Sequence, residues 1–160
     1  MTEYGESLIR LAFTYVKDIH KAEDIIQDVF LKVYANLHQF KGESSFKTYL
    51  YRITINQCKD YLKSWSFKNL FFTEKNIEYS FDSFESTVLR FEENYELGMK
   101  ILDLPIKYRE VIILHYYQDY SISEIATLLT VSESTIHTRL RRAKQRLKEK
   151  IFIGAGENLE

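Results

Sequence analysis

The chain has 160 residues, a hydrophobic content of 45% and a net charge of −1. This length allows one medium domain or two small ones, and the hydrophobic content supports folded cores and excludes wholesale disorder. The single cysteine, Cys58, excludes an intramolecular disulfide and a cysteine metal cluster, and no apolar run reaches the roughly 18 residues that a membrane span needs.

Helical periodicity recurs along the chain and strand-like alternation is weak, so we expect an all-α fold. The first helix is predicted over about 4–17 and the second over about 21–38, with a break at 18–20. The apolar stripe of the second helix consists of Ala22, Ile25, Ile26, Val29, Phe30, Val33, Tyr34 and Leu37. Its other face carries Glu23, Asp24, Gln27, Asp28 and Lys32, which ordinary solvation also explains.

A third helix is predicted over about 46–64. Gly42 allows a tight turn before it, and Ser44 or Ser45 can cap it. The helix mixes rings with cations: Phe46, Lys47, Tyr49, Tyr51, Arg52, Lys59, Tyr61 and Lys63. Such a mixture suits single-stranded nucleic acid, where bases stack on rings and cations bind phosphates. A buried helix face explains part of the rings equally well, and Cys58 is expected to be a small core residue.

The stretch 66–94 has loose periodicity and combines phenylalanines with acidic residues, which disfavours a DNA surface. We interpret it as an interdomain linker with a partial helix near 84–91. A helix over about 95–102 ends before Pro105, which suits the first turn of the next helix, predicted to run to about 117. His115 is interpreted as a polar residue of that helix rather than a ligand, because the four histidines show no ligand spacing.

The last third of the chain predicts two helices joined by a very short turn. Ser121 and Glu124 form a capping box before the first, over 122–129. Ser132 can cap the second, with Val131 and Ile136 placed for a hydrophobic staple. An apolar stripe then continues through Ile136, Leu140, Ala143, Leu147 and Ile151. Two helices in this arrangement are typical of a helix-turn-helix.

Between 132 and 150, seven basic and two acidic residues give the second helix a net charge of +5. Short polar residues at its start suit base edges in a major groove, and the cations further along suit phosphates. The predicted DNA contacts are Ser134, Thr135, His137, Thr138, Arg139, Arg141, Arg142 and Lys144. The alternative is a solvated amphipathic helix. Since the whole chain carries −1, acidic surface elsewhere offsets this helix and suits a protein partner.

Two stretches resemble one known family. The run A-E-D-I-I-Q-D-V-F-L-K-V-Y (22–34), followed by F-K-G-E-S-S-F-K-T-Y-L-Y-R-I (40–53), resembles region two of the extracytoplasmic-function sigma factors, which are promoter-recognition subunits of bacterial RNA polymerase. The run L-P-I-K-Y-R-E-V-I-I-L-H-Y-Y (104–117) and the helix-turn-helix resemble region four. The resemblance implies two small helical domains: region two over 1–65, a flexible linker over 66–94, region four over 95–152 and a frayed tail over 153–160.

The resemblance also implies roles for particular residues. Asp24, Gln27, Asp28 and Lys32 would bind a coiled coil of the polymerase β′ subunit. The loop 41–45 and the following helix would capture unpaired bases of the minus-ten element, with contacts from Lys41, Ser44, Ser45, Phe46, Lys47, Arg52, Asn56 and Lys59. Unstacking a base costs a few kcal/mol, which stacking rings and polar loop atoms must offset. The helix-turn-helix would bind the minus-thirty-five element.

The chain departs from the family pattern at two positions. Tyr49 stands where the family often has tryptophan, so aromatic character is kept. Thr130 stands in the turn where the family often has glycine. If Thr130 adopts a positive φ, it carries strain of order 1 kcal/mol.

We therefore expect a sigma factor that works in a cytoplasmic setting and performs no bond chemistry itself. The sequence shows no nucleophile–base arrangement, metal-ligand spacing or glycine-rich phosphate loop, so no cofactor is expected. The expected partners are core RNA polymerase, through its β′ and β subunits, and promoter DNA. The family suggests, as a hypothesis, a membrane-tethered anti-sigma factor. Two alternatives stay open: a stand-alone dimeric helix-turn-helix regulator, and an enzyme in the N-terminal half.

Overall fold

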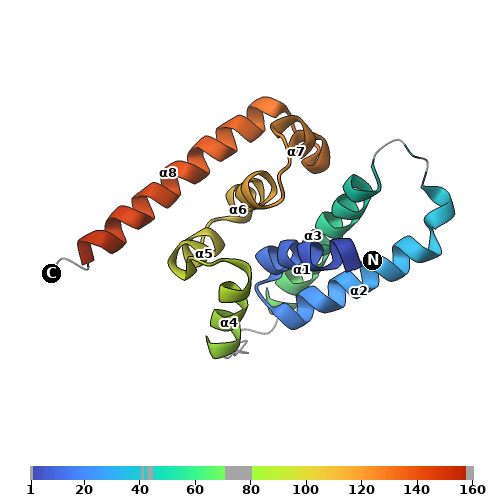
Figure 1. The fold of residues 1–160 in the computed structure, drawn as a ribbon, viewed down its shortest axis with the longest axis horizontal. Coiled ribbons are helices and arrows are strands. Elements are labelled where there is room, and N and C mark those ends of the chain that lie inside the picture. The colour runs from blue at the N-terminus through green and yellow to red at the C-terminus, as the bar shows by residue number, and fades with distance from the viewer. Residues whose placement is uncertain (1, 41, 43–44, 71–80, 158–160) are drawn as a thin grey trace. The chain divides into compact units, whose positions relative to one another are not determined.

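The computed structural model describes residues 2–40, 42, 45–70 and 81–157 (Figure 1). Within these ranges every regular element is a helix, which confirms the expected all-α fold. The chain divides into two compact units, Met1–Thr87 and Val88–Glu160. None of the helices in the described ranges combines the length and apolar character of a membrane span.

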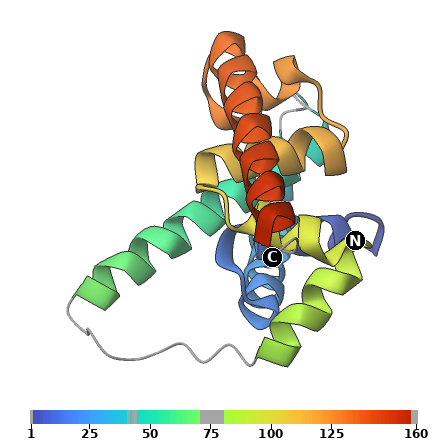
Figure 2. The same cartoon turned by 90° about the vertical axis from the view of Figure 1, so that its left-hand side faces the viewer.

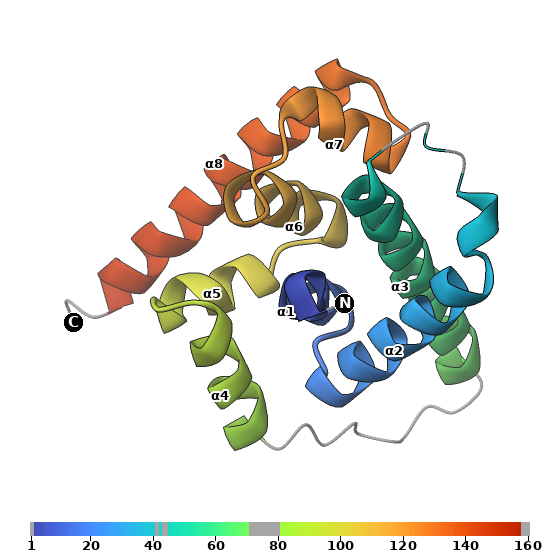
Figure 3. The same cartoon turned by 45° about the vertical axis from the view of Figure 1, so that its right-hand side comes forward.

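The first unit is built from three helices, α1 (Thr2–Val16), α2 (Ile19–Ala35) and α3 (Phe46–Leu70), and each contacts the other two (Figure 3). Their apolar faces meet in a core that includes the fully buried side chains of Leu8, Leu11, Val29 and Ile55. Cys58 lies in this core, as expected, and burial raises the pKa of its thiol to about 12. The thiol therefore stays protonated, and unreactive, at neutral pH.

Local capping decides where α2 begins and ends. The Asp18 carboxylate accepts hydrogen bonds from the backbone N–H groups of His20 and Lys21, at 2.9 and 3.2 Å, so α2 begins two residues before the predicted start. The helix ends at Ala35, where the Asn36 amide donates to the Lys32 carbonyl at 2.9 Å. A 3-10 turn, η1 (Leu37–Gln39), replaces the last predicted turn.

The third helix is longer than predicted. α3 begins at Phe46, as expected, but continues to Leu70 rather than ending near 64. The stretch 65–70 contains neither glycine nor proline, so nothing in it stops the helix when the apolar periodicity weakens. α4 (Phe81–Phe91) follows and is longer than the partial helix predicted there. Both helices thus extend into the stretch interpreted as a linker, whose residues 71–80 lie outside the described ranges.

The second unit contains α5 (Tyr95–Leu102), α6 (Ile106–Ile112), a π turn η2 (Ile113–Tyr117), α7 (Ile122–Leu129) and α8 (Glu133–Glu157). α6 and α7 both pack on the long α8 helix, which is the orange-to-red ribbon that runs to the C-terminus in Figure 2. The core between them includes the fully buried side chains of Leu104, Val111, Leu114, Ile125 and Ile136.

The helix predicted from 105 to 117 is not uniform. Pro105 is the N-cap of α6, one residue before the first turn where it was expected. After Ile112 the hydrogen bonding widens: the N–H of Gln118 bonds the carbonyl of Ile113, five residues back, at 3.0 Å. The N–H of Tyr120 then bonds the Leu114 carbonyl at 3.0 Å, so the chain turns toward α7. Side-chain periodicity cannot distinguish these wider bonds from an α-helix in advance.

α8 corrects two expectations about the end of the chain. Residues 153–157 are helical rather than frayed, and 158–160 lie outside the described ranges. The predicted apolar stripe is buried at Ile136, Leu140 and Ala143, but Ile151 is 47% exposed. Phe152 and Ile153 beside it are 66% and 64% exposed. The apolar stripe therefore anchors only the first half of α8 in the core.

Candidate nucleic-acid interface

The turn between α7 and α8 is held by the caps that the sequence predicts. Ser121 and Glu124 form the capping box, each side chain bonding the other residue's backbone N–H at 3.2 Å. Thr130 ends α7 in the left-handed region, with φ 58° and ψ 47°, so the suspected positive φ is present. The Ser132 hydroxyl accepts a hydrogen bond from the Thr135 N–H at 3.2 Å and caps α8. These bonds fix the residues at which α7 and α8 begin.

The outer face of α8 presents the predicted DNA contacts. Ser134, His137, Arg141, Arg142 and Lys144 are exposed, and Thr135 and Thr138 are half-buried. The buried Ile136, Leu140 and Ala143 lie on the opposite side of the helix. Hydroxyl and imidazole groups therefore lie in the first two turns of α8, and most guanidinium and ammonium groups lie further along it. The first set can contact base edges, and the second set can bind phosphates.

Arg139 is arranged differently from the other predicted contacts. Its Nη1 atom lies 3.9 Å from Oε1 of Glu110, a buried carboxylate on α6. The side chain of Arg139 is only 26% exposed. A buried carboxylate that loses its counter-charge is costly, so Arg139 is committed at least in part to holding α8 on α6. Its role in DNA binding remains a prediction.

A hollow of about 220 Å³ lies where α6 meets α8. It is lined by Lys107, Tyr108, Ser134, Thr135, Thr138, Arg139 and Arg142. We call it the α6–α8 hollow. Five of these residues were predicted DNA contacts, whereas Lys107 and Tyr108 were missed. Tyr108 follows the apolar pattern of α6, and no local signal shows that it faces the cations of α8.

Tyr108 lies among basic side chains. Arg142 hydrogen-bonds its hydroxyl, the Arg146 guanidinium lies 4.9 Å from its ring centroid, and Lys107 Nζ lies 5.0 Å from the same centroid. Burial raises the pKa of Tyr108, but the Arg142 hydrogen bond and the charges of Lys107 and Arg146 outweigh it and lower the pKa from its ordinary value. The positive potential of this region is therefore large enough to affect a neutral phenol.

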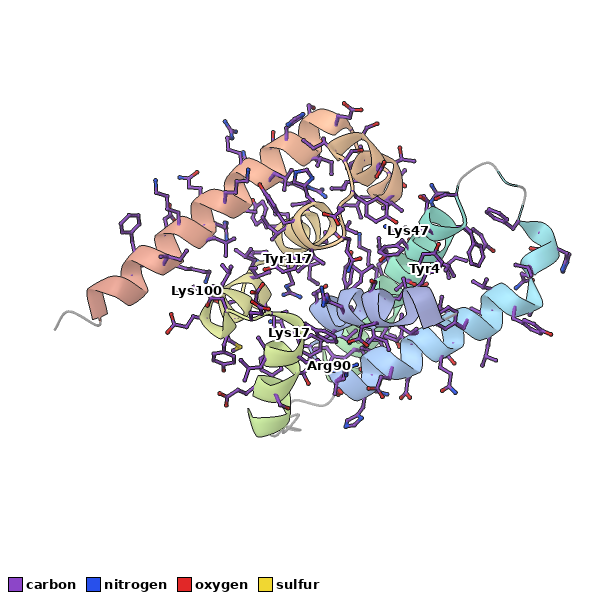
Figure 4. All side chains as sticks on the ribbon, in the orientation of Figure 1. Tyr4, Lys17, Lys47, Arg90, Lys100 and Tyr117 are labelled. Atoms are coloured by element: carbon purple, nitrogen blue, oxygen red, sulfur yellow. The ribbon has the colours of Figure 1, made fainter. Side chains whose placement is uncertain are left out.

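The first unit places a cluster of rings at the start of α3. Phe40 lies 5.1 Å from Tyr49 and 5.9 Å from Phe46, and Tyr4 of α1 lies 6.3 Å from Phe46, all between ring centroids. We call these four residues the ring cluster. Phe46 is 39% exposed, so one ring of the cluster is open for stacking. Tyr4, labelled on α1 in Figure 4, was missed because helical periodicity does not show which helices pair.

Other predicted minus-ten residues surround the ring cluster or follow it along α3. The Ser45 hydroxyl accepts the Thr48 N–H at 3.1 Å, so Ser45 is the cap of α3, whereas Lys41 and Ser44 lie outside the described residues. Lys47, labelled in Figure 4, places its Nζ 5.6 Å from the Tyr51 ring centroid. Three further predicted contacts share one side of the helix at spacings of four and three residues: Arg52, Asn56 and Lys59.

The predicted polymerase-binding residues form one exposed strip along α2. Asp24, Gln27, Asp28 and Lys32 are all exposed, and Lys32 Nζ donates to the Gln57 side-chain carbonyl of α3 at 2.7 Å. Three large apolar side chains are exposed beside the strip or just beyond it: Leu31 at 63%, Tyr34 at 80% and Leu37 at 52%. Tyr34 and Leu37 belong to the predicted apolar stripe of the second helix, but they are exposed rather than packed in the core. Exposed apolar residues among charges are typical of a protein-binding surface.

The described residues contain no group of histidine, cysteine or acidic side chains placed to hold a metal. His115, which was interpreted as a polar helix residue, lies with Nδ1 2.8 Å from the Tyr120 carbonyl.

Comparisons with known proteins agree with this arrangement. The family model described as Sigma-70 region 2 matches residues 1–66, and the model described as Sigma-70, region 4 matches residues 95–147. The chain is 31% identical over 158 residues to the ECF RNA polymerase sigma factor SigW of Bacillus subtilis (strain 168), covering 92% of this chain and 84% of that protein. It is 29% identical over 153 residues to the RNA polymerase sigma-H factor of Pseudomonas aeruginosa, covering 89% of this chain and 79% of that protein.

Solved structures show the same fold. The sigma factor RpoE from Bartonella quintana, solved in complex with the anti-sigma factor NepR, matches with a TM-score of 0.76 at 21% identity. The match covers 95% of this chain and 94% of that one. CnrH, solved in complex with the cytosolic domain of CnrY, matches with a TM-score of 0.68 at 22% identity.

Proposed function

Since the chain belongs to the extracytoplasmic-function group of the sigma-70 family and is an RNA polymerase sigma factor, we propose that its two units divide promoter recognition between them. The first unit binds core polymerase and the minus-ten element, and the second binds the minus-thirty-five element. The observation that carries this proposal is that the region 2 match falls within the first unit and the region 4 match within the second.

In the second unit, α8 enters the major groove of the minus-thirty-five element. The exposed Ser134 and His137, with Thr138 behind them, are placed to meet base edges, and Arg141, Arg142 and Lys144 to bind phosphates. Capping bonds support this assignment, because they hold the start of α8 in one position before DNA binds. A prepared helix loses less conformational freedom on binding.

In the first unit, the ring cluster and the cations along α3 capture the non-template strand of the minus-ten element. The open ring of Phe46 offers a stacking surface, and base–aromatic stacking contributes about 1–3 kcal/mol per base. That amount is similar to the few kcal/mol that unstacking a base costs. The cations Arg52 and Lys59 then follow the phosphates of the separated strand.

The strip on α2 binds core polymerase. The carboxylates of Asp24 and Asp28 suit a basic partner surface, and the exposed Leu31 and Tyr34 supply apolar contact beside them. The acidic residues of this strip also help to offset the positive charge of α8, which agrees with the net charge of −1 of the whole chain. In this proposal the β′ and β subunits are the partners, and polymerisation belongs to the core enzyme.

We further propose that an anti-sigma factor regulates the chain. Two proteins with the same fold were solved with a partner: the sigma factor RpoE in complex with the anti-sigma factor NepR, and CnrH in complex with the cytosolic domain of CnrY. A partner that covered the strip on α2 or the outer face of α8 would prevent polymerase or DNA binding. A membrane-tethered partner would couple release to a signal across the membrane.

Run-off transcription with core polymerase on a library of promoter fragments tests the proposed function. Asp28→Arg should abolish co-elution with core polymerase and all run-off product, because it reverses a charge at the centre of the strip. Asp60→Arg is the matched control: Asp60 is an exposed acidic residue on α3, outside the strip on α2. Circular dichroism should show equal helix content in both variants.

Normal co-elution of the Asp28→Arg variant would contradict the assignment of the α2 strip. If the unaltered protein bound duplex DNA tightly but never joined core polymerase, the chain would instead act as a stand-alone helix-turn-helix regulator.

A further inference from the structure

The α6–α8 hollow gathers positive charge from two different helices. Lys107 comes from the first turn of α6, and Arg139 and Arg142 come from α8. Among the described residues that line the hollow, no side chain is a carboxylate. Glu110, whose carboxylate lies 3.9 Å from the Arg139 guanidinium, is buried and does not line the hollow. Lys107 and Arg142 are therefore available to an anion from solvent.

Hydroxyl groups complete the lining of the hollow. Ser134, Thr135 and Thr138 project from the first two turns of α8, and each hydroxyl can donate to an anionic oxygen. Cations that donate N–H bonds, together with hydroxyls that donate O–H bonds, are the usual partners of a phosphate group. A carboxylate would need fewer donors than this lining provides, since it has only two oxygens.

Tyr108 holds one of these cations in place. Arg142 hydrogen-bonds the Tyr108 hydroxyl, while the tyrosine ring is only 4% exposed and lies beneath Arg146. The residue is thus fixed by packing, and its hydroxyl lies where it can accept a hydrogen bond from the Arg142 guanidinium. Tyr108 is accordingly a positioning residue: it acts on the anion through Arg142.

The position of the hollow beside α8 in the second unit indicates which kind of phosphate it binds. The same stretch of α8 that lines it, from Ser134 to Arg142, carries the residues proposed to read the minus-thirty-five element. A duplex that takes α8 into its major groove has a backbone running past one side of that helix. The α6–α8 hollow lies on the side of α8 that faces α6.

We propose that the α6–α8 hollow binds one backbone phosphate of the minus-thirty-five duplex, with Lys107 as a direct contact and Tyr108 as the residue that positions Arg142. This proposal rests on the proposed function and adds α6 to the DNA-binding elements of the second unit. Neither residue belongs to the helix-turn-helix itself.

Two variants of the full chain, assembled with core polymerase on a promoter fragment, separate the two roles. Lys107→Gln removes a charge and should lower affinity several-fold, reducing the slope of log affinity against log salt by about 0.9. Tyr108→Phe keeps the ring but releases Arg142, so affinity should fall while the slope stays unchanged. The matched control is Lys100→Gln, because Lys100 Nζ lies beside Gly154 (Figure 4), roughly 18 Å along α8 from Arg142.

Single methylphosphonate substitutions across the minus-thirty-five fragment provide the decisive test. At one phosphate, neutralisation should weaken the unaltered holoenzyme but have no further effect on the Lys107→Gln holoenzyme. Losses that simply add at every phosphate would overturn the proposal. So would saturable binding of inorganic phosphate at Tyr108, followed by nuclear magnetic resonance and lost in Lys107→Gln, without coupling to any DNA phosphate.

The same experiment distinguishes this proposal from the proposed function. If the unaltered protein forms no holoenzyme or shows no promoter binding, the proposed function fails. If promoter binding is present and weakened by Arg141→Ala, but Lys107→Gln behaves like Lys100→Gln, only the assignment of the hollow fails.

Discussion

Thr130 is the residue at which the helix-turn-helix departs most from relaxed backbone geometry. It ends α7 with φ 58° and ψ 47°, a region that a β-branched residue rarely adopts. The side chain costs about 1–2 kcal/mol there, because its Cβ approaches the following carbonyl oxygen. Glycine relieves this strain. It also gives the unfolded chain more conformational freedom, which lowers the stability by about 0.4–1 kcal/mol. Thr130→Gly should therefore stabilise the second unit by roughly 0.5–1 kcal/mol.

Native-state hydrogen exchange measures this change within the second unit alone. The backbone amides of Ile125 and Ile136 bond the carbonyls of Ser121 and Ser132 at 2.9 and 3.2 Å, on either side of the turn. Their exchange in Thr130→Gly should be roughly two to five times slower, since 1.4 kcal/mol corresponds to a factor of ten. Chain-wide melting is less suitable, because two units need not unfold in one transition.

Thr127→Gly is the matched control for this prediction. Thr127 is exposed three residues earlier in α7, where its hydroxyl bonds the Ser123 carbonyl at 3.2 Å. Its backbone is helical, so glycine there should destabilise the unit by a few tenths of a kcal/mol and speed exchange. Unchanged or faster exchange in Thr130→Gly would refute the strain argument, because glycine would then give no stabilisation at the left-handed position.

Two further predictions concern charge. Arg141→Ala should reduce the salt slope of promoter binding by about 0.9, measured on holoenzyme over a series of salt concentrations, and an unchanged slope would remove Arg141 from the phosphate contacts. Cys58 has an ordinary pKa of 9.0 that burial raises to about 12, so its contribution to stability is fully present below pH 9.0 and declines as the pH rises toward 12. The unfolding free energy of Cys58→Ala should lack this decline, and parallel pH profiles for both proteins would contradict it.

Local signals in the sequence were enough to place the starts of α3, α7 and α8. The capping box at Ser121 and the caps at Ser45 and Ser132 depend on residues within four positions of one another, so short-range chemistry decides them. The positive φ of Thr130 could be anticipated from the family resemblance, because the family often has glycine at this position of the turn. The family resemblance, which two family models confirm, rests on runs of the same kind.

Features that depend on distant parts of the chain were missed for a different reason. Tyr34 follows the helical period of α2 but is 80% exposed, although its neighbour Val33 is buried. Tyr108 reads as an ordinary core residue until α8 brings Arg142 to its hydroxyl. Tyr4 joins the ring cluster only because α1 packs on α3. Periodicity shows which face of a helix is apolar but not which neighbour meets it.

The π turn η2 makes the length of the chain between α6 and α7 as important as its composition. Its wider bonds, with Gln118 joined to Ile113 and Tyr120 to Leu114, hold one more residue than an α-helical turn would. One residue corresponds to roughly 100° of rotation and 1.5 Å of rise. A deletion here that kept α-helical bonding would rotate everything that follows and aim α7 away from its place on α8. Insertions and deletions should therefore be excluded from Ile113–Tyr117 during divergence, even where substitutions are accepted.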